Sequence, residues 1–260
     1  MASREKNPEV IEFAKTLQGV PWCEEYEKMI SGMMYDGYGP ELSTARFRAR
    51  KWMNKYNTHF PDDATPESLT ADREAMLQDI MGKIGKGSFI EPPLSIDYGS
   101  NISIGEGFYS NFNLAILDCS IVKIGNRVLF GPNVSLFAAT HDTAVQSRRN
   151  LEEYAKGITI GDDCWIGGNT IIMPGITIGK GCTVGAGSVV TKDVPDFSIA
   201  LGAPAKVVKA VEAVADLCGL DAMSNSKIKG LQGPSKFQDA KKIDAGHPAK
   251  ETGPPPPGRR

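Results

Sequence analysis

The stretch ITIGDDCWIGGNTIIMPGITIGKGCTVGAGSVVTKDVP, residues 158–195, repeats a simple pattern every six residues. Aliphatic residues occupy every sixth position, in the series Ile160, Ile166, Ile172, Ile178, Val184 and Val190. A compact residue stands four residues after each of these aliphatic residues, in the series Cys164, Thr170, Ile176, Cys182, Ser188 and Val194. An α-helix repeats about every 3.6 residues and a β-strand about every 2, so neither explains this period.

A period of six is typical of a coil with three short strands and three corners, one hexapeptide on each side. Each side turns one aliphatic side chain into a triangular interior, and glycine accommodates the unusual backbone angles of the corners. Stacked coils bury the ladder, at about 1.5–3 kcal/mol for each fully buried side chain. The pattern continues upstream at Ile104-Gly105, Ile124-Gly125 and Phe130-Gly131. A β-sandwich with coincidental spacing is the alternative, but the unbroken series favours a parallel β-helix, which we predict over residues 88–211.

The chain before this region has helical rather than hexapeptide periodicity. Residues 1–20 form a polar lead-in, and residues 21–86 carry signals for a small helical domain. Pro40 and Ser43 precede one apolar stripe, formed by Phe47, Trp52, Met53 and Tyr56. Pro66-Glu67-Ser68 opens a second stripe, formed by Leu69, Met76, Leu77, Ile80 and Ile84. We expect both helices to pack their apolar faces on the β-helix.

The chain after the repeat changes again. Residues 212–223 predict a short helix that caps the open end of the stack. Residues 224–260 hold eight Lys and Arg against three acidic residues and end in GPPPPGRR. This composition predicts a disordered basic tail.

Composition and charge are those of an ordinary globular protein. The 260 residues are 41% hydrophobic and 23% charged, with a net charge of −2, so nothing in the balance indicates nucleic acid or an anionic membrane as a partner. The five cysteines lack metal-ligand spacing and are expected to be reduced thiols. No apolar run is long enough for a signal peptide core or a membrane span, so we expect a cytoplasmic protein.

His141 is the candidate catalytic histidine, although a single exposed histidine is usually an ordinary surface residue. The hexapeptide rhythm stops after Leu136 and resumes near Ile160, which predicts an excursion loop over residues 141–157. Loops that project from a rigid scaffold are common places for functional sites. The other histidines are His59, which we expect to have a capping or packing role, and His247 in the predicted tail.

Four segments of the chain resemble the maltose and galactoside O-acetyltransferases. They are YGSNISIGEGFYSNFNLAILDC (98–119), ATHDT (139–143), the repeat stretch at 158–195, and LGAPAKVV (201–208). MISGMMYDGYGPELSTARFRARKWMNKYN (29–57) is similar to the small N-terminal domain of that family. The resemblance spans about residues 26–211. It implies the left-handed form of the β-helix, acetyl-CoA as cosubstrate, a sugar-like hydroxyl as acceptor, and a homotrimer with sites between subunits.

Acetyl transfer from a thioester needs a base near the attacking oxygen, donors for the oxyanion and a channel for coenzyme A. The resemblance implies that His141 is the general base, with Asn111 beside it, and that transfer is direct because no Cys or Ser occupies a nucleophile position. It implies an acceptor pocket lined by Tyr109, Asp97 and Asp118, with Arg46, Asp36, Glu152 and Glu153 as further candidates. It implies a coenzyme A site formed by Trp165, Gly168, Ala186, Thr191 and Lys192, with Lys206 and Lys209 at the nucleotide phosphates. Gly168 is also the candidate oxyanion donor, and no metal is expected.

The sequence departs from the family at two positions and leaves other functions open. Asp142 stands where relatives often have proline, and Cys119 stands where a second acid is common, which leaves the acceptor uncertain. A γ-type carbonic anhydrase would need three zinc-binding histidines, and the repeat region offers only His141. A non-catalytic β-helix scaffold has no need of these motifs. A different acyl donor or a non-sugar acceptor remains the closest alternative.

Overall fold

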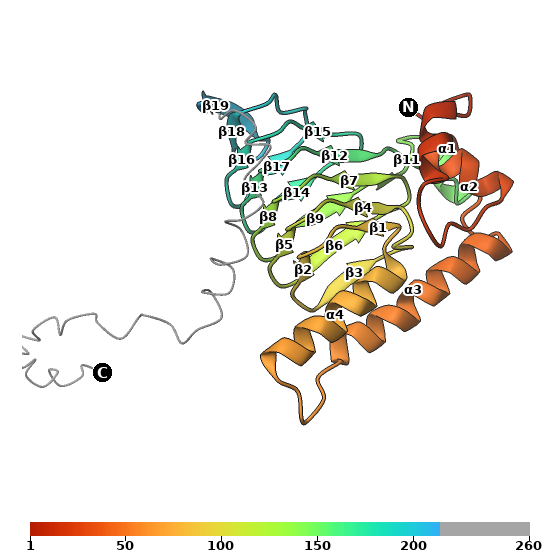
Figure 1. Cartoon of the computed structure of the whole chain (residues 1–260). Coiled ribbons are helices and arrows are strands. Elements are labelled where there is room, and N and C mark those ends of the chain that lie inside the picture. Colours follow the sequence, from red (N-terminus) through yellow and green to blue (C-terminus); the bar gives the residue numbers. More distant parts are fainter. Residues whose placement is uncertain (214–260) are drawn as a thin grey trace, which may run out of the picture. The chain divides into compact units, whose positions relative to one another are not determined.

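Three parallel β-sheets wind around a common core from Lys83 onward, and four of the five described helices precede them in the chain (Figure 1). The computed structural model describes residues 1–213. The first sheet contains β1 (Lys83–Ile84), β4 (Ile102–Ile104), β7 (Val122–Ile124), β12 (Ile158–Ile160) and β15 (Thr177–Ile178). The second contains β2 (Phe89–Ile90), β5 (Tyr109–Ser110), β8 (Leu129–Phe130), β13 (Trp165–Ile166), β16 (Thr183–Val184), β18 (Ser198–Leu201) and β19 (Lys206–Ala210). The third contains β3 (Leu94–Ile96), β6 (Leu114–Leu117), β9 (Ser135–Phe137), β14 (Ile171–Ile172) and β17 (Val189–Val190).

The interior of the stack is the ladder that the hexapeptide period predicts. Every residue of the aliphatic series from Ile160 to Val190 is at most 1% exposed. The offset series from Cys164 to Val194 is buried as well. Each strand pairs in register with the strand one coil away, as in Trp165 with Thr183, so the ladder also satisfies the backbone. The parallel β-helix is therefore formed by the residues that were expected to form it.

The coils are not all of one length, which the six-residue period did not predict. The paired residues Lys83, Ser103 and Lys123 of the first sheet are 20 residues apart, whereas Thr159 and Thr177 are 18 apart. The extra residues fall where the chain passes from the third sheet to the first, a place we call the third-to-first corner. The excursion between β9 and β12 leaves the stack at this same corner. Every departure from the hexapeptide rule between β1 and β15 is therefore at one edge of the prism.

Two long helices cover the first coil. α3 (Pro40–Thr58) contacts β3, and α4 (Pro66–Ile80) contacts β1 and β2 (Figure 1). Both begin with proline in the first turn, and Thr65 and Ser68 form a capping box at the start of α4. Trp52, Tyr56, Leu77 and Ile80 are buried in the same core as the coil residues.

Some details of the helical prediction were wrong. Phe47 is 70% exposed, so it does not belong to the buried stripe of α3. Ile84 lies in β1, so the first coil begins at Lys83, inside the range expected to be helical and before residue 88. The apolar spacing of Ile84 from Ile80 reflects two elements that share one core.

Two shorter helices form a second core against the third-to-first corner. α1 (Pro8–Ala14) lies within the expected polar lead-in, and Asn7 caps its first turn. α2 (Glu24–Ile30) contacts β11 (Tyr154–Ala155) of the excursion. The second core joins residues of these helices to corner residues, among them Tyr26, Met29, Tyr98, Cys119 and Ala155. The N-terminal segment thus supports the irregular edge of the stack.

The expected capping helix at 212–223, apart from its first two residues, and the tail at 224–260 lie outside the described residues. Within residues 1–213, β19 ends the stack by pairing antiparallel with β18. None of the helices in this part of the chain has both the length and the apolar character that crossing a bilayer requires.

Candidate active site

His141 directly follows β10 (Ala139–Thr140), which pairs antiparallel with β11 at the base of the excursion. Its imidazole is exposed, and Nδ1 lies 3.2 Å from the backbone carbonyl oxygen of Glu152. A carbonyl oxygen can only accept a hydrogen bond, so Nδ1 carries the proton in this contact. In the neutral ring Nε2 then has a free lone pair, which is the form a general base needs.

The excursion that carries His141 is tied down on both sides. The Tyr35 N–H donates to the Glu153 carbonyl at 3.2 Å, which joins the excursion to the N-terminal segment. α5 (Val145–Arg149) forms its tip. The guanidinium of Arg148 donates to the carbonyls of Asp142 and Thr143 at 2.9 and 2.7 Å. Asp142 itself accepts the N–H of Ala144 at 2.9 Å, so it closes the turn after the histidine.

Asp118 does not line an acceptor pocket, contrary to the expectation from the sequence. Its side chain is fully buried, and its carboxylate accepts the N–H groups of Asp97, Tyr98 and Gly99 at 2.9, 2.9 and 2.8 Å. Burial raises the pKa of Asp118 to about 7, against the opposing effect of the amide donors. Asp118 therefore shapes the corner from within.

Asp97 stands at the same corner and is only partly buried. The Cys119 thiol donates to its carboxylate at 3.5 Å, so the cysteine that replaces a common acid of the family is paired with the acid that remains. Burial raises the pKa of both groups. Of Asp97 and Asp118, Asp97 is the one with surface left for a ligand.

The other acceptor candidates surround the corner in different ways. Arg46 donates to the Tyr98 hydroxyl at 2.6 Å and to the Gly37 carbonyl, so two of its five N–H donors are used inside the chain. Glu152 accepts from Ser147 at 3.0 Å, and Asp36 accepts the Tyr38 N–H at 2.8 Å. A hollow of about 440 Å³ is lined by Glu25, Met34, Tyr35, Asp36, Tyr38, Asn150, Leu151 and Glu152. The structure thus brings Asp36 and Glu152 together.

Tyr109 and Asn111 lie at a different edge from His141. Tyr109 is in β5 of the second sheet, and Asn111 follows it at the second-to-third corner. The Asn111 side chain accepts the Phe112 N–H at 2.7 Å, and within residues 1–213 no hydrogen bond joins it to His141. One side of the prism, the third sheet, separates the two groups in a single chain.

The candidate coenzyme A residues divide between the same two corners. Gly168 and Ala186 follow β13 and β16, so they lie on the second-to-third corner like Asn111, in later coils of the stack. Trp165 beside them is 53% exposed. Thr191 and Lys192 follow β17 and lie on the third-to-first corner, the edge of His141. Lys206 and Lys209 are exposed on β19. The second-to-third corner and the third-to-first corner of one chain therefore each hold part of the expected site.

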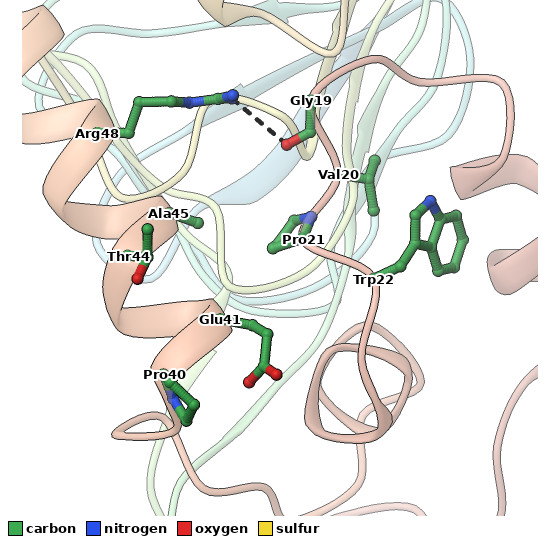
Figure 2. Close-up of a pocket in the computed structure, with 9 residues that line it drawn as sticks. All are labelled: Gly19, Val20, Pro21, Trp22, Pro40, Glu41, Thr44, Ala45 and Arg48. Atoms are coloured by element: carbon green, nitrogen blue, oxygen red, sulfur yellow. Dashed lines mark hydrogen bonds between the residues drawn. The ribbon is translucent and has the colours of Figure 1, made fainter.

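Sequence reasoning missed two features of the structure, one beside the candidate site and one apart from the residues predicted to form it. The Tyr35 hydroxyl is buried beside this corner and has no hydrogen-bond partner among residues 1–213. A second hollow, of about 540 Å³, opens between residues 19–22 and α3, with Trp22 and Glu41 on its walls (Figure 2). None of the residues that the sequence predicts for the catalytic, acceptor or coenzyme A site lines this second hollow. No motif in the sequence marks either feature, because both arise from packing between distant segments.

Comparison with known proteins shows similarity in sequence and in fold to acetyltransferases. Residues 28–85 match the maltose acetyltransferase hexapeptide capping motif, and residues 157–192 match the hexapeptide repeat of succinyl-transferase. Galactoside O-acetyltransferase of Escherichia coli is 37% identical over 185 residues, covering 71% of this chain and 88% of that protein. A maltose O-acetyltransferase from Clostridium difficile has a TM-score of 0.66 at 37% identity, covering 74% of this chain and 99% of that one. A galactoside acetyltransferase in complex with coenzyme A has a TM-score of 0.67 at 35% identity, covering 74% and 92%.

A coil stack with a helical cap and these motifs defines a hexapeptide-repeat acetyltransferase. The chain belongs to the maltose and galactoside O-acetyltransferase family. The predicted fold class is confirmed: a parallel β-helix, which the repeat predicts, in the left-handed form that the resemblance implies, behind a small helical region.

Proposed function

We propose that this chain transfers the acetyl group of acetyl-CoA to a hydroxyl of a sugar. The sugar oxygen forms a bond to the acetyl carbon while the carbon–sulfur bond of the thioester breaks. The hydroxyl proton moves to Nε2 of His141 and then to the thiolate of coenzyme A. No acyl-enzyme intermediate is involved.

The observation that carries this proposal is the contact between Nδ1 of His141 and the Glu152 carbonyl. It favours the tautomer in which Nδ1 carries the proton and Nε2 is unprotonated. A base held in this way suits proton removal from a hydroxyl, which contributes about 10²–10⁴-fold to a rate.

The donor side of the proposal rests on the second-to-third corner. Gly168 and Ala186 are small residues that follow β13 and β16, and they are proposed to lie along the thin arm of coenzyme A, with the Gly168 N–H as the donor to the oxyanion. Trp165 offers an exposed ring beside them, and Lys206 and Lys209 offer cations for phosphate groups. A relative of similar fold was solved in complex with coenzyme A, which supports this cosubstrate.

A homotrimer completes the proposed site. A threefold arrangement can set the second-to-third corner of one chain, with Asn111 and Gly168, against the third-to-first corner of the next, with His141 and Lys192. The division of the site residues between two corners of one chain supports this assembly. Because four described cysteines are free thiols, we place the reaction in the cytoplasm.

A sugar acceptor is supported by the polar groups at the third-to-first corner and by the relatives. Asp97 offers a carboxylate that suits vicinal hydroxyls, with Tyr109 and Asn111 proposed to reach it from the neighbouring chain. Asp36, Glu152, Glu153 and Arg46 surround this corner as further proposed contacts. Relatives carry the names galactoside and maltose O-acetyltransferase.

The experiment is thiol release from acetyl-CoA with glucose, maltose and methyl β-galactoside, beside a blank without acceptor. Release that depends on a sugar supports the proposal. Acetyl-CoA binding without release would point to a non-sugar acceptor, and absence of binding would point to a scaffold. His141→Ala should lower turnover about 10²-fold or more, whereas His59→Ala, a histidine paired with Asp72 at 2.9 Å, should not.

The shared site has its own test. Asn111→Ala and His141→Ala should each be nearly inactive alone. Mixed trimers formed by refolding the two variants together should recover activity, because some sites then combine an intact Asn111 corner with an intact His141 corner. No recovery in mixed trimers would contradict a site between subunits.

A further inference from the structure

The third-to-first corner of the first two coils is held by a carboxylate that has no exposed surface. Asp118 accepts three consecutive backbone N–H groups, those of Asp97, Tyr98 and Gly99, at 2.8–2.9 Å. Gly99 has a φ of +76°, so the chain turns sharply at the end of this run. In a corner longer than the hexapeptide, some backbone N–H groups have no acceptor in a stacked strand. The Asp118 carboxylate is the acceptor for these N–H groups instead.

A second set of buried hydrogen bonds leads from the backbone carbonyl of Asp118 to the helical region. The Asn101 side-chain amide donates to the Asp118 carbonyl at 2.6 Å. The Tyr26 hydroxyl of α2 donates to Oδ1, the side-chain oxygen of Asn101, at 2.9 Å. Tyr26, Asn101 and Asp118 are all fully buried, so the network is rigid and its members cannot meet an acceptor themselves.

This network ends at the backbone of Asp97. The Asp97 N–H is bound by Asp118, and the Asp97 carboxylate receives the Cys119 thiol from the residue after Asp118. Asp118 and Cys119 therefore fix the backbone and the side chain of the same partly exposed acid. Other corner carboxylates do not converge on a candidate acceptor group: Asp162 holds Asn126 at the first-to-second corner.

We infer that Asp118 is a positioning residue for acceptor recognition, acting through the backbone of Asp97, and that Tyr26 and Asn101 extend this function to α2. The inference rests on the proposed function, because it assigns Asp97 to the acceptor. It explains why the corner is longer than a hexapeptide in the coils beneath the helices: the added residues present the acid, and the buried carboxylate holds them.

The test is the kinetics of Asp118→Asn at pH 8, with acetyl-CoA and the best of glucose, maltose and methyl β-galactoside. Asparagine presents N–H donors toward amides that also donate, so the corner loses its geometry. We expect the KM for the acceptor to rise about tenfold or more, with the KM for acetyl-CoA changed less than about twofold. Asp162→Asn is the matched control, and it should leave both constants unchanged.

Equal rises of both KM values in Asp118→Asn, or an unchanged acceptor KM, would overturn the inference. A wild-type chain that releases no thiol with any sugar would instead overturn the proposed function, and the inference with it. Tyr26→Phe provides a gentler variant, expected to raise the acceptor KM about three- to tenfold. Tyr56→Phe, which removes another buried hydroxyl that donates to the Ile90 carbonyl, should not raise it.

Discussion

Gly131→Ala should damage the corner that holds the proposed oxyanion donor, the Gly168 N–H, without touching any proposed catalytic side chain. A Cβ at Gly131 would lie 2.5 Å from the Gly168 nitrogen, 2.9 Å from the Gly168 Cα and 3.2 Å from the Gly167 carbonyl carbon. All three are backbone atoms of the next coil, so no side chain can rotate to make room. The coils must separate locally, and the Gly168 N–H must move with them.

These contacts indicate how much stability and activity Gly131→Ala should lose. Overpacking of this kind destabilises a protein by about 1–3 kcal/mol. For a domain of about 200 residues, that lowers the thermal midpoint by about 2–12 °C. A displacement on the order of 1 Å at a group that stabilises the transition state can cost about 10²-fold in rate, so kcat should fall more than stability suggests.

The assay compares thermal unfolding and thiol release for Gly131→Ala and Gly125→Ala. A Cβ at Gly125 would lie 2.6 Å from the Asp162 nitrogen and 2.8 Å from the Gly161 carbonyl carbon, a similar clash at the first-to-second corner. We expect both variants to lose similar stability and only Gly131→Ala to lose kcat. If both lose activity in proportion to stability, or if Gly131→Ala keeps full kcat, the placement of the oxyanion donor at Gly168 is wrong.

Three further predictions test stability and binding. Ile172→Ala should cost about 2–5 kcal/mol in urea unfolding, because the side chain is fully buried between coils, whereas the partly exposed Ile171→Ala should cost clearly less; equal losses would contradict the ladder. Trp165→Ala should change the free energy of unfolding by less than about 0.5 kcal/mol, because the ring is 53% exposed. It should also weaken acetyl-CoA binding about tenfold in calorimetry, and unchanged affinity would remove Trp165 from the site. Burial raises the pKa of Asp118 to about 7, so the folded state binds an extra proton between about pH 4 and that value, and this group's contribution to stability falls as pH rises through the window. The free energy of unfolding of the wild type, taken relative to that of Asp118→Asn, should therefore fall as pH rises through this window, and a constant difference would show that Asp118 does not titrate there.

The regular part of the fold could be predicted because each position of the repeat has one physical task. Ile166 and Val184 are apolar, six-residue periodic and buried, and no distant segment is needed to explain them. The longer coils could not be predicted in the same way. Ile96 and Ile104 are eight residues apart, which breaks the period, and the sequence alone does not show which corner absorbs the difference.

The candidate site could be predicted by residue type but not by arrangement. His141 stood out because the repeat breaks around it. The role of Asp118 was misjudged, because a carboxylate that binds a ligand and a carboxylate that binds backbone amides look alike in sequence. Only the stacking of coils shows that Asp118 lies inside the corner and Asp97 at its surface.

The position proposed for the acceptor and the base follows from how a β-helix satisfies its own backbone. Along the regular sides, each strand bonds to the coils above and below, and inward side chains fill the core, so little polar capacity remains for a ligand. Polar groups become available where the ladder is interrupted. At the third-to-first corner the longer coils present Asp97, and the excursion presents His141. Such a corner would be loose on its own, because its amides have no strand partners. Asp118 and the helices that pack there make it rigid, so the irregular edge can hold groups in the fixed geometry that acyl transfer requires.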